Sequence, residues 1–273
     1  MKLGLAQFEI EAGAPTGNRE RALEYISTAA RQDVDIVVLP ELFTAGYFAF
    51  DHYAETAESA AGETIQAIAA AAADHGMAVV AGSIVEDLSA SDADGIDVPA
   101  PEGLSNTTVF LDANGNRRAI YRKHHLFGYD SAEAELLTPG EHLPTVTFGG
   151  FTIGMSTCYD LRFPELYRAL AGAGVSLVLV PSAWPYPRVE HWRLLPRARA
   201  VENLTYVAAA NGVGDQGDAE LLGRSAVYDP WGSTIAAAGD EERLITAAID
   251  PDRVAEIRSE FPALDDRREI YSQ

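Results

Sequence analysis

Short apolar segments alternate with segments of helical period along this chain, and this alternation limits the fold more than any other feature. Strands separated by helices early in the chain, with hairpins later, favour an α/β layered fold with mixed sheets. No internal repeat and no change in composition marks a second domain, so we expect one domain over residues 1–273. The predicted strands are Lys2–Phe8, Asp35–Leu39, Met77–Ile84, Asn106–Leu111, Arg117–Tyr121, Thr145–Phe148, Phe151–Met155, Ser176–Val180, Leu204–Ala210, Gly223–Tyr228, Thr234–Ala237 and Leu244–Ile249, and the predicted helices are Asn18–Arg31, Gly62–His75, Pro164–Gly172, Val189–Asn203 and Pro251–Phe261.

Three segments depart from this alternation. Residues 87–103 are acidic and contain glycine and proline, which predicts an exposed acidic loop. The chain after residue 261 predicts an extended C-terminal tail. Pro196 interrupts the helical pattern of 189–203, and because proline has no N–H to donate, it predicts a kink or a late helix start.

The formal net charge of −21 argues against nucleic acid or an anionic membrane as a partner, because phosphates would be repelled. No apolar run reaches the roughly 18 residues of a membrane-spanning helix, and the first residues lack the apolar region of a secretory signal. We therefore expect a cytoplasmic location. Lysine occurs only at Lys2 and Lys123, and this skew is equally compatible with adaptation to high salt and with the solvated acidic surface of a protein from a GC-rich genome.

The single cysteine, Cys158, excludes an internal disulfide and a four-thiolate zinc site. It follows an apolar strand and precedes a helix that begins with Pro164, which places it at a sheet edge where α/β proteins build sites. A helix amino terminus and a cation nearby would lower the thiol pKa from its free value of about 8.5. The alternative is a buried inert cysteine, since lone cysteines are often core residues.

Two further groups also come directly after apolar strands. Glu41 precedes a loop rich in aromatic residues, and apolar walls raise a carboxyl pKa by desolvation, which suits a general base; the alternative is a solvated residue at a helix entry. Lys123 is an internal lysine in a chain that otherwise uses arginine, which hints at a task that needs an ammonium group. The neighbours His124 and His125 point to opposite faces of a strand, so we expect no metal. A nucleophile, a base and an electrostatic stabiliser would thus come together.

At these positions the chain resembles the nitrilase superfamily of carbon–nitrogen hydrolases. The segments LPELFTAGY around Glu41, YRKHHLFG around Lys123 and STCYDLRFPEL around Cys158 are similar to its three signature segments and follow the same order. The segments LLTPGE, PSAWP, RARAVEN and DPWGS fit as well. The resemblance implies a four-layer α-β-β-α sandwich with two mixed sheets, built into homodimers or larger homo-oligomers, with no cofactor.

The resemblance also implies roles for individual residues. Cys158 would be the nucleophile, Glu41 the general base and Lys123 the stabiliser of the tetrahedral intermediate. A second glutamate before the Thr-Pro-Gly turn corresponds to Glu133, with Glu135 as the competitor, and the alternative for both is a charge on a polar loop. The residues expected to bind substrate are Tyr159, Arg162, Tyr47, Ser182 and Trp184.

The residues after Cys158, YDLRF, are similar to the omega-amidase branch, which hydrolyses the terminal amide of small dicarboxylic acid monoamides such as 2-oxoglutaramate. The alternatives are an N-carbamoyl amidohydrolase or a nitrilase, and less strongly a non-catalytic binding protein on the same fold. An acidic protein with an anionic substrate needs a local positive patch, which Arg162 and Arg188 would supply. For Arg162 the sequence favours a structural ion pair instead.

Overall fold

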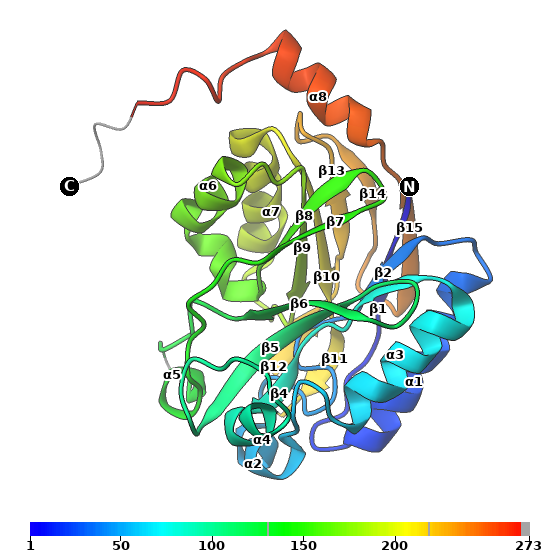
Figure 1. Cartoon of the computed structure of the whole chain (residues 1–273), viewed down its shortest axis with the longest axis vertical. Coiled ribbons are helices and arrows are strands. Elements are labelled where there is room, and N and C mark those ends of the chain that lie inside the picture. Colours follow the sequence, from blue (N-terminus) through cyan, green and yellow to red (C-terminus); the bar gives the residue numbers. More distant parts are fainter. Residues whose placement is uncertain (130, 218, 269–273) are drawn as a thin grey trace.

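Two large β-sheets pack face to face in the computed structural model, which describes residues 1–129, 131–217 and 219–268 (Figure 1). Strand β9 (Leu177–Ser182) begins with four apolar residues, Leu177 to Val180, and the two layers that cover it account for them. Leu177 and Leu179 pack in the cluster between the sheets, whereas Val178 and Val180 pack under the outer helices. Because successive side chains point to opposite faces, a strand covered on both faces needs an apolar residue at every position.

The first sheet has seven strands in the order β15-β1-β2-β3-β5-β4, with β6 also paired to β5. Strands β1, β2 and β3 are parallel, and the remaining pairings are antiparallel. Helices α1 (Pro15–Ala30) and α3 (Glu63–His75) cover its outer face over a cluster that includes Ile26 and Ile68. The strands are β1 (Lys2–Gln7), β2 (Ile36–Val38), β3 (Ala78–Val80), β4 (Ile84–Asp87), β5 (Leu104–Leu111), β6 (Arg117–Arg122) and β15 (Arg243–Ala248).

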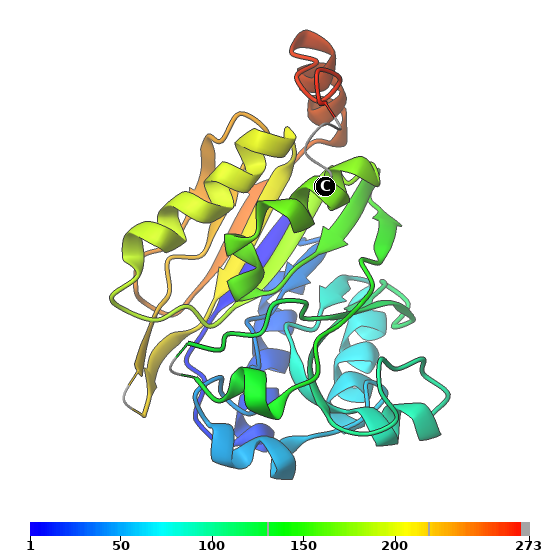
Figure 2. The same cartoon turned by 90° about the vertical axis from the view of Figure 1, so that its left-hand side faces the viewer.

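The second sheet has six strands in the order β14-β13-β10-β9-β8-β7, and its central strands β8, β9 and β10 are parallel. Helices α6 (Pro164–Gly172) and α7 (Val189–Asn203) form its outer layer, as the view from the side also shows (Figure 2). The predicted four-layer α-β-β-α sandwich with two mixed sheets is therefore confirmed. The other strands of this sheet are β7 (Thr145–Phe148), β8 (Phe151–Met155), β10 (Tyr206–Asn211), β13 (Ala226–Tyr228) and β14 (Thr234–Ala237).

Several smaller elements complete the described part of the chain. Helix α8 stands at one end of the sandwich (Figure 1 and Figure 2). None of the described helices is long and apolar enough to cross a membrane. Strands β11 and β12 form a separate two-stranded sheet that the sequence did not predict. These elements are η1 (Phe50–His52), α2 (Tyr53–Thr56), α4 (Leu88–Ala93), α5 (Glu133–Leu136), η2 (Cys158–Arg162), β11 (Val213–Gln216), β12 (Ala219–Leu222) and α8 (Pro251–Glu260).

Two predicted segments are corrected by the structure. The acidic stretch 87–103 is not a loop throughout, because α4 occupies residues 88–93, with Leu88 and Ser91 buried and the Asp87 side chain capping its first turn. The predicted strand Met77–Ile84 is two strands, β3 and β4. They are separated at Gly82, where a side chain would collide with the carbonyl oxygen of Pro40.

Two further segments differ from expectation: the helix around Pro196 and, separately, the C-terminal tail. Helix α7 begins at Val189, so the late start predicted from Pro196 is wrong. The described part of the predicted tail includes a turn closed by a hydrogen bond from Asp265 N–H to the Pro262 carbonyl. Residues 269–273 of that predicted tail lie outside the described residues.

Candidate active site

Glu41, Lys123 and Cys158 come from distant parts of the chain and meet where strands of both sheets end. Glu41 follows β2, Lys123 follows β6, and Cys158 opens η2 shortly after β8. The backbone N–H of Glu41 donates to the Ser182 carbonyl at the end of β9, which links the two sheets at this point. The prediction that the three groups come together is confirmed in their geometry.

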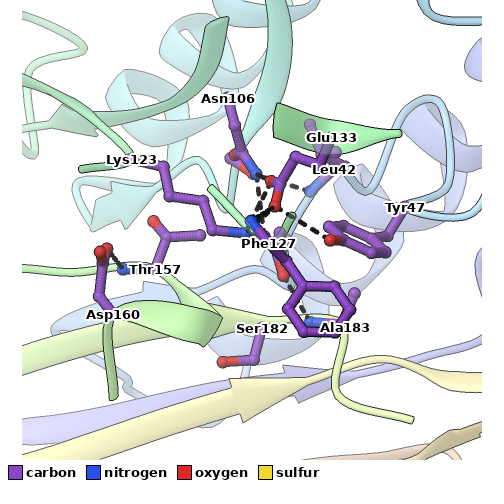
Figure 3. A network of polar contacts seen from close by, with 12 residues as sticks. Leu42, Tyr47, Asn106, Lys123, Phe127, Glu133, Thr157, Asp160, Ser182 and Ala183 are labelled. Atoms are coloured by element: carbon purple, nitrogen blue, oxygen red, sulfur yellow. Dashed lines mark hydrogen bonds and ion pairs between the residues drawn. The ribbon is translucent and has the colours of Figure 1, made fainter. Parts of the chain in front are cut away.

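Lys123 is fully buried between Glu41 and Glu133, and Figure 3 shows it beside Glu133. Its Nζ lies 2.8 Å from Glu41 Oε1 and 2.7 and 3.0 Å from Glu133 Oε1 and Oε2. Burial by itself lowers the pKa of Lys123, but the charges of Glu133 and Glu41 outweigh it and hold the pKa well above its usual value. Lys123 is therefore an ammonium group, and its three donors face acceptors at short range.

Glu41 is also fully buried, and its two carboxylate oxygens have different partners. Oε1 accepts from Lys123 Nζ and from Asn106 Nδ2 at 2.9 Å, whereas Oε2 accepts from the Ala183 backbone N–H at 2.8 Å. Burial raises the pKa of Glu41, Lys123 opposes this and Glu133 adds to it, so the net shift is upward. The predicted raised pKa of this carboxyl is confirmed in direction.

Glu133 is buried at the start of α5, whereas its competitor Glu135 is exposed. Glu133 accepts hydrogen bonds from Lys123 and Asn106 and from two further donors. Tyr47 Oη donates to Glu133 Oε2 at 3.0 Å, and the Phe127 N–H donates to the same oxygen at 2.7 Å (Figure 3). Four donor groups thus hold this carboxylate, which suits it to orient Lys123. The interpretation of Glu133 as a charge on a polar loop is wrong.

The backbone around Cys158 is held in an unusual conformation. Cys158 has a φ of 46°, in the left-handed region that side chains other than glycine rarely adopt. A capping box closes the turn, with the Thr157 N–H donating to Asp160 Oδ2 at 2.9 Å. Asp160 Oδ1 accepts from the backbone N–H of His125, two residues after Lys123, at 3.0 Å. This contact ties the turn of the nucleophile to the segment that carries the ammonium group.

The thiol pKa of Cys158 differs from the expectation. Burial raises it most, the charge of Glu41 raises it further, and Lys123 only partly opposes them, so the pKa lies well above the usual range of a thiol. The predicted lowering is wrong because burial and the charge of Glu41 outweigh the nearby cation. The resting nucleophile is therefore a neutral thiol, which needs a base at the moment of attack.

A small cavity of about 40 Å³ opens at Cys158. Four of the five residues predicted to bind substrate line it, but Ser182 does not, because it is fully buried at the end of β9. Larger hollows exist elsewhere, such as one of about 510 Å³ beside Arg118, but that one contains no nucleophile. The lining residues are Tyr47, Phe48, Phe127, Cys158, Tyr159, Arg162, Ala183, Trp184, Pro185 and Arg188.

Two arginines lie in this lining without a carboxylate partner among the residues that the structure describes. Arg162 donates to His191 Nδ1 at 3.1 Å, and its guanidinium carbon lies 5.2 Å from the centre of a Trp184 ring. Arg188 lies over the Phe127 ring at 5.6 Å. The structural ion pair that the sequence favoured for Arg162 is absent within residues 1–129, 131–217 and 219–268.

Sequence reasoning missed two groups that contact Glu41. Asn106 had a signal, since it stands inside the strand segment LSNTTVFL and asparagine is disfavoured in strands. The Ala183 N–H had none, because a backbone donor does not depend on the side chain that the sequence specifies. Over the described parts of the chain, no group of three or more His, Cys, Asp or Glu has a geometry suited to a metal ion.

Comparison with protein families assigns the chain. The family described as carbon-nitrogen hydrolase matches residues 2–259. The chain belongs to the carbon–nitrogen hydrolase family. Among relatives in this family, the 2-oxoglutaramate amidase of Paenarthrobacter nicotinovorans is 38% identical over 239 residues, which cover 86% of this chain and 78% of the relative.

Solved structures of the carbon–nitrogen hydrolase family agree with the fold. Nit3 of Saccharomyces cerevisiae, a member of branch 10 of the nitrilase superfamily, is 30% identical with a TM-score of 0.87, over 98% of this chain and 96% of that one. A mutant amidase of Nesterenkonia sp. AN1 is 29% identical with a TM-score of 0.79, over 97% and 99% of the chains. Its structure shows the result of Michael addition of acrylamide at the active site cysteine.

Proposed function

We propose that this protein hydrolyses the terminal amide of a small dicarboxylic acid monoamide and releases ammonia, with Cys158 as nucleophile, Glu41 as general base and Lys123 as stabiliser. The observation that carries the proposal is the buried Glu41–Lys123–Glu133 cluster beside Cys158, which itself lines a cavity together with two arginines. The similarity to a 2-oxoglutaramate amidase supports this substrate class.

Acylation begins with the neutral thiol. Cys158 Sγ attacks the amide carbonyl carbon while its proton passes to Glu41, whose carboxylate lies close enough for its charge to raise the thiol pKa. The oxyanion is stabilised by the Lys123 ammonium and by the Tyr159 N–H in the first turn of η2, where backbone donors have no intrahelical acceptor. One well-placed donor of this kind is worth about 3–4 kcal/mol in the transition state.

Collapse of the tetrahedral intermediate then breaks the carbon–nitrogen bond. Glu41 gives its proton to the departing nitrogen, ammonia leaves, and a thioester remains on Cys158. Glu41 next takes a proton from water, whose oxygen attacks the thioester carbonyl. Return of that proton to the sulfur releases the carboxylic acid and restores the thiol. Glu133 keeps Lys123 in place through both steps, since it contacts Nζ with both oxygens.

We propose that Arg162 and Arg188 bind the distal carboxylate of the substrate. A protein with a net charge of −21 repels anions overall, so an anionic substrate needs local cations near the nucleophile. Arginine matches the geometry of a carboxylate, and neither guanidinium is neutralised by a described carboxylate. Tyr47, Tyr159 and Trp184 supply the apolar contact for the carbon chain between the two ends.

Ammonia release should be measured across a panel of omega-amides, carbamoyl amines and nitriles, with rapid quenching and intact-mass analysis. We expect the highest kcat/KM for the monoamides of dicarboxylic acids and an acyl adduct on Cys158. Release of carbon dioxide would identify an N-carbamoyl amidohydrolase, and turnover of a nitrile would identify a nitrilase. A Cys158→Ala variant that still released ammonia at the full rate would contradict the scheme.

We further propose that the protein forms a homodimer or a larger homo-oligomer. Large apolar side chains are exposed on α7 and beside it, and Leu194 and Val201 stand seven residues apart on one face of that helix. A Leu194→Glu variant should have a lower mass by light scattering than the unmodified protein, and an unchanged mass would contradict the use of this face. The exposed apolar residues on α7 and beside it are Leu194, Val201, Trp231 and Phe261.

The cytoplasmic location stays a prediction.

A further inference from the structure

Asn106 on β5 is fully buried and touches both glutamates of the site, and Figure 3 shows it beside Glu133. Its Nδ2 donates to Glu41 Oε1 at 2.9 Å and to Glu133 Oε1 at 3.2 Å. Lys123 Nζ contacts the same two oxygens at 2.8 and 2.7 Å. The backbone carbonyl of Asn106 also accepts a hydrogen bond from the Lys123 N–H at 2.9 Å. Strand pairing therefore places the Asn106 amide and the Lys123 ammonium side by side.

We propose that Asn106 is a positioning residue of the reaction, whose amide holds the Glu41 and Glu133 carboxylates around the Lys123 ammonium so that the second oxygen of Glu41 serves the nucleophile. The inference rests on the proposed function to the extent that Glu41 is the base. It adds a neutral donor that keeps two anions and one cation in a fixed arrangement.

The two glutamates differ in what holds their remaining oxygen. Glu133 Oε2 is held by Lys123, Tyr47 and the Phe127 N–H, whereas among the described residues the hydrogen bond to Glu41 Oε2 comes from the Ala183 N–H. The last torsion of a glutamate is broad, so a carboxylate with fewer donors rotates more freely. Without Asn106, Lys123 would be the remaining described donor to Oε1 of Glu41. The carboxylate could then rotate, and Oε2 would no longer be held in one position.

The strand itself gains little from an asparagine at this position. Asn106 Oδ1 is buried and has no hydrogen-bond partner among the described residues, and an unpaired buried acceptor lowers stability. Asparagine is also disfavoured in strands. The opposite orientation of the amide would direct Oδ1 at two carboxylates, so the donors to Glu41 and Glu133 determine how it lies. A functional role accounts for a residue that the fold alone does not favour.

Loss of this donor should appear in the pH dependence of catalysis. A hydrogen bond to the charged form of an acid lowers its pKa, so removing the Asn106 donor should raise the pKa of Glu41 further. The other groups that face Glu41 would remain in the variant. They are Lys123, Glu133, Cys158, Tyr47 and Tyr53.

The test compares Asn106→Leu, which keeps the number and branching of the side-chain heavy atoms but has no donor, with Asn203→Leu as the matched control. Asn203 is also buried, its Oδ1 also lacks a partner in the described part of the chain, and its Nδ2 donates to the Arg199 carbonyl within α7. Both variants lose a buried amide, but only Asn106 touches the glutamates. Asn106→Asp, which keeps the shape and replaces the donor by an acid, covers the case in which Asn106→Leu does not fold.

We expect Asn106→Leu to lower kcat about tenfold to hundredfold at neutral pH, to leave KM within about threefold, and to move the acid limb of kcat/KM up by about one pH unit. Asn106→Asp should move the acid limb in the same direction. Asn203→Leu should lower the melting temperature but leave the acid limb of kcat/KM where it is. A folded Asn106→Leu with the original limb and kcat would overturn the inference. Absence of a Cys158 acyl adduct in the unmodified protein would instead overturn the proposed function.

Discussion

Two regions on either side of Cys158, a buried cluster of carboxylates and the arginine-bearing lining of the cavity, differ in how far the fold has already satisfied their charges. On the carboxylate side (Glu41, Asn106, Lys123 and Glu133), every residue is fully buried and each charge is paired at 2.7–3.0 Å. On the arginine side (Tyr159, Arg162, Trp184 and Arg188), the guanidinium groups lie over aromatic rings and no described carboxylate neutralises them.

This difference separates two tasks of one site. Groups that are buried and fully paired are preorganised, so they stabilise charge in the transition state without rearranging. Cations that are left unpaired can exchange a weak contact for a substrate carboxylate. The carboxylate side should therefore determine whether any amide is hydrolysed, and the arginine side should determine which one.

The largest expected effect belongs to Lys123→Met. The substitution removes the ammonium and leaves two buried carboxylates without a cation, which should lower the free energy of unfolding by roughly 3–5 kcal/mol. Ammonia release should fall at least about thousandfold for every amide, since the oxyanion loses its main charge partner. Urea unfolding and initial rates measure both effects. Arg253→Met is the control, because its pair with Glu256 is exposed and worth about 0.5 kcal/mol.

Next in size is Arg162→Met, which tests the arginine side alone. We expect KM for a dicarboxylic acid monoamide to rise about tenfold to hundredfold, because a charge-assisted contact to the carboxylate is lost. KM for a neutral aliphatic amide should stay within about threefold. Arg193→Met provides a control with an exposed arginine of α7. Equal losses for both substrates would show that the two sides do not have separate tasks.

A smaller effect is expected from acid, and it should be the same for every substrate. Glu41 must be ionised to accept the thiol proton, and its pKa is raised above 4.5 by burial. The rate constant kcat/KM should therefore fall as the pH drops through that raised value, by about tenfold for each pH unit below it. A profile for two substrates locates the limb. An acid limb at or below pH 4.5 would contradict the burial argument.

The smallest effect concerns the surface and not the cavity. If the charge of −21 is an adaptation to high salt, screening of self-repulsion should raise the melting temperature by several degrees between low and molar salt. The carboxylate side is fully buried and therefore shielded from salt, so kcat for a neutral amide should change little. A melting temperature that does not rise with salt would leave the solvated acidic surface as the explanation.

Much of the carboxylate side could be predicted from local sequence. Glu41, Lys123 and Cys158 each follow an apolar strand, and strand ends are where an α/β fold gathers its polar groups. Glu133 was predicted by resemblance, because nothing in its own polar segment indicates burial. Asn106 was missed although its strand position was unusual. The Ala183 N–H could not have been found, since only the exit geometry of β9 directs it at Glu41.

The arginine side was less predictable. Ser182 was expected to bind substrate, but its position at the end of β9 buries its side chain away from the cavity lining. For Arg162 the sequence favoured an ion pair, whereas the fold brings aromatic rings and a histidine to it. Both outcomes depend on which segments pack together over long sequence separations, and local patterns carry no record of that.

By itself the sequence determined the alternation of strands and helices, the layered architecture and the three residue types that the chemistry needs, because period and strand ends are local properties of a chain. Only the tertiary structure decided the protonation of the site. The pKa of Cys158 is raised by burial and by the charge of Glu41, whereas that of Lys123 is held high by Glu133 and Glu41 against the effect of burial. Those distances exist only after the two sheets have packed, so no single segment could reveal that the resting nucleophile is a neutral thiol.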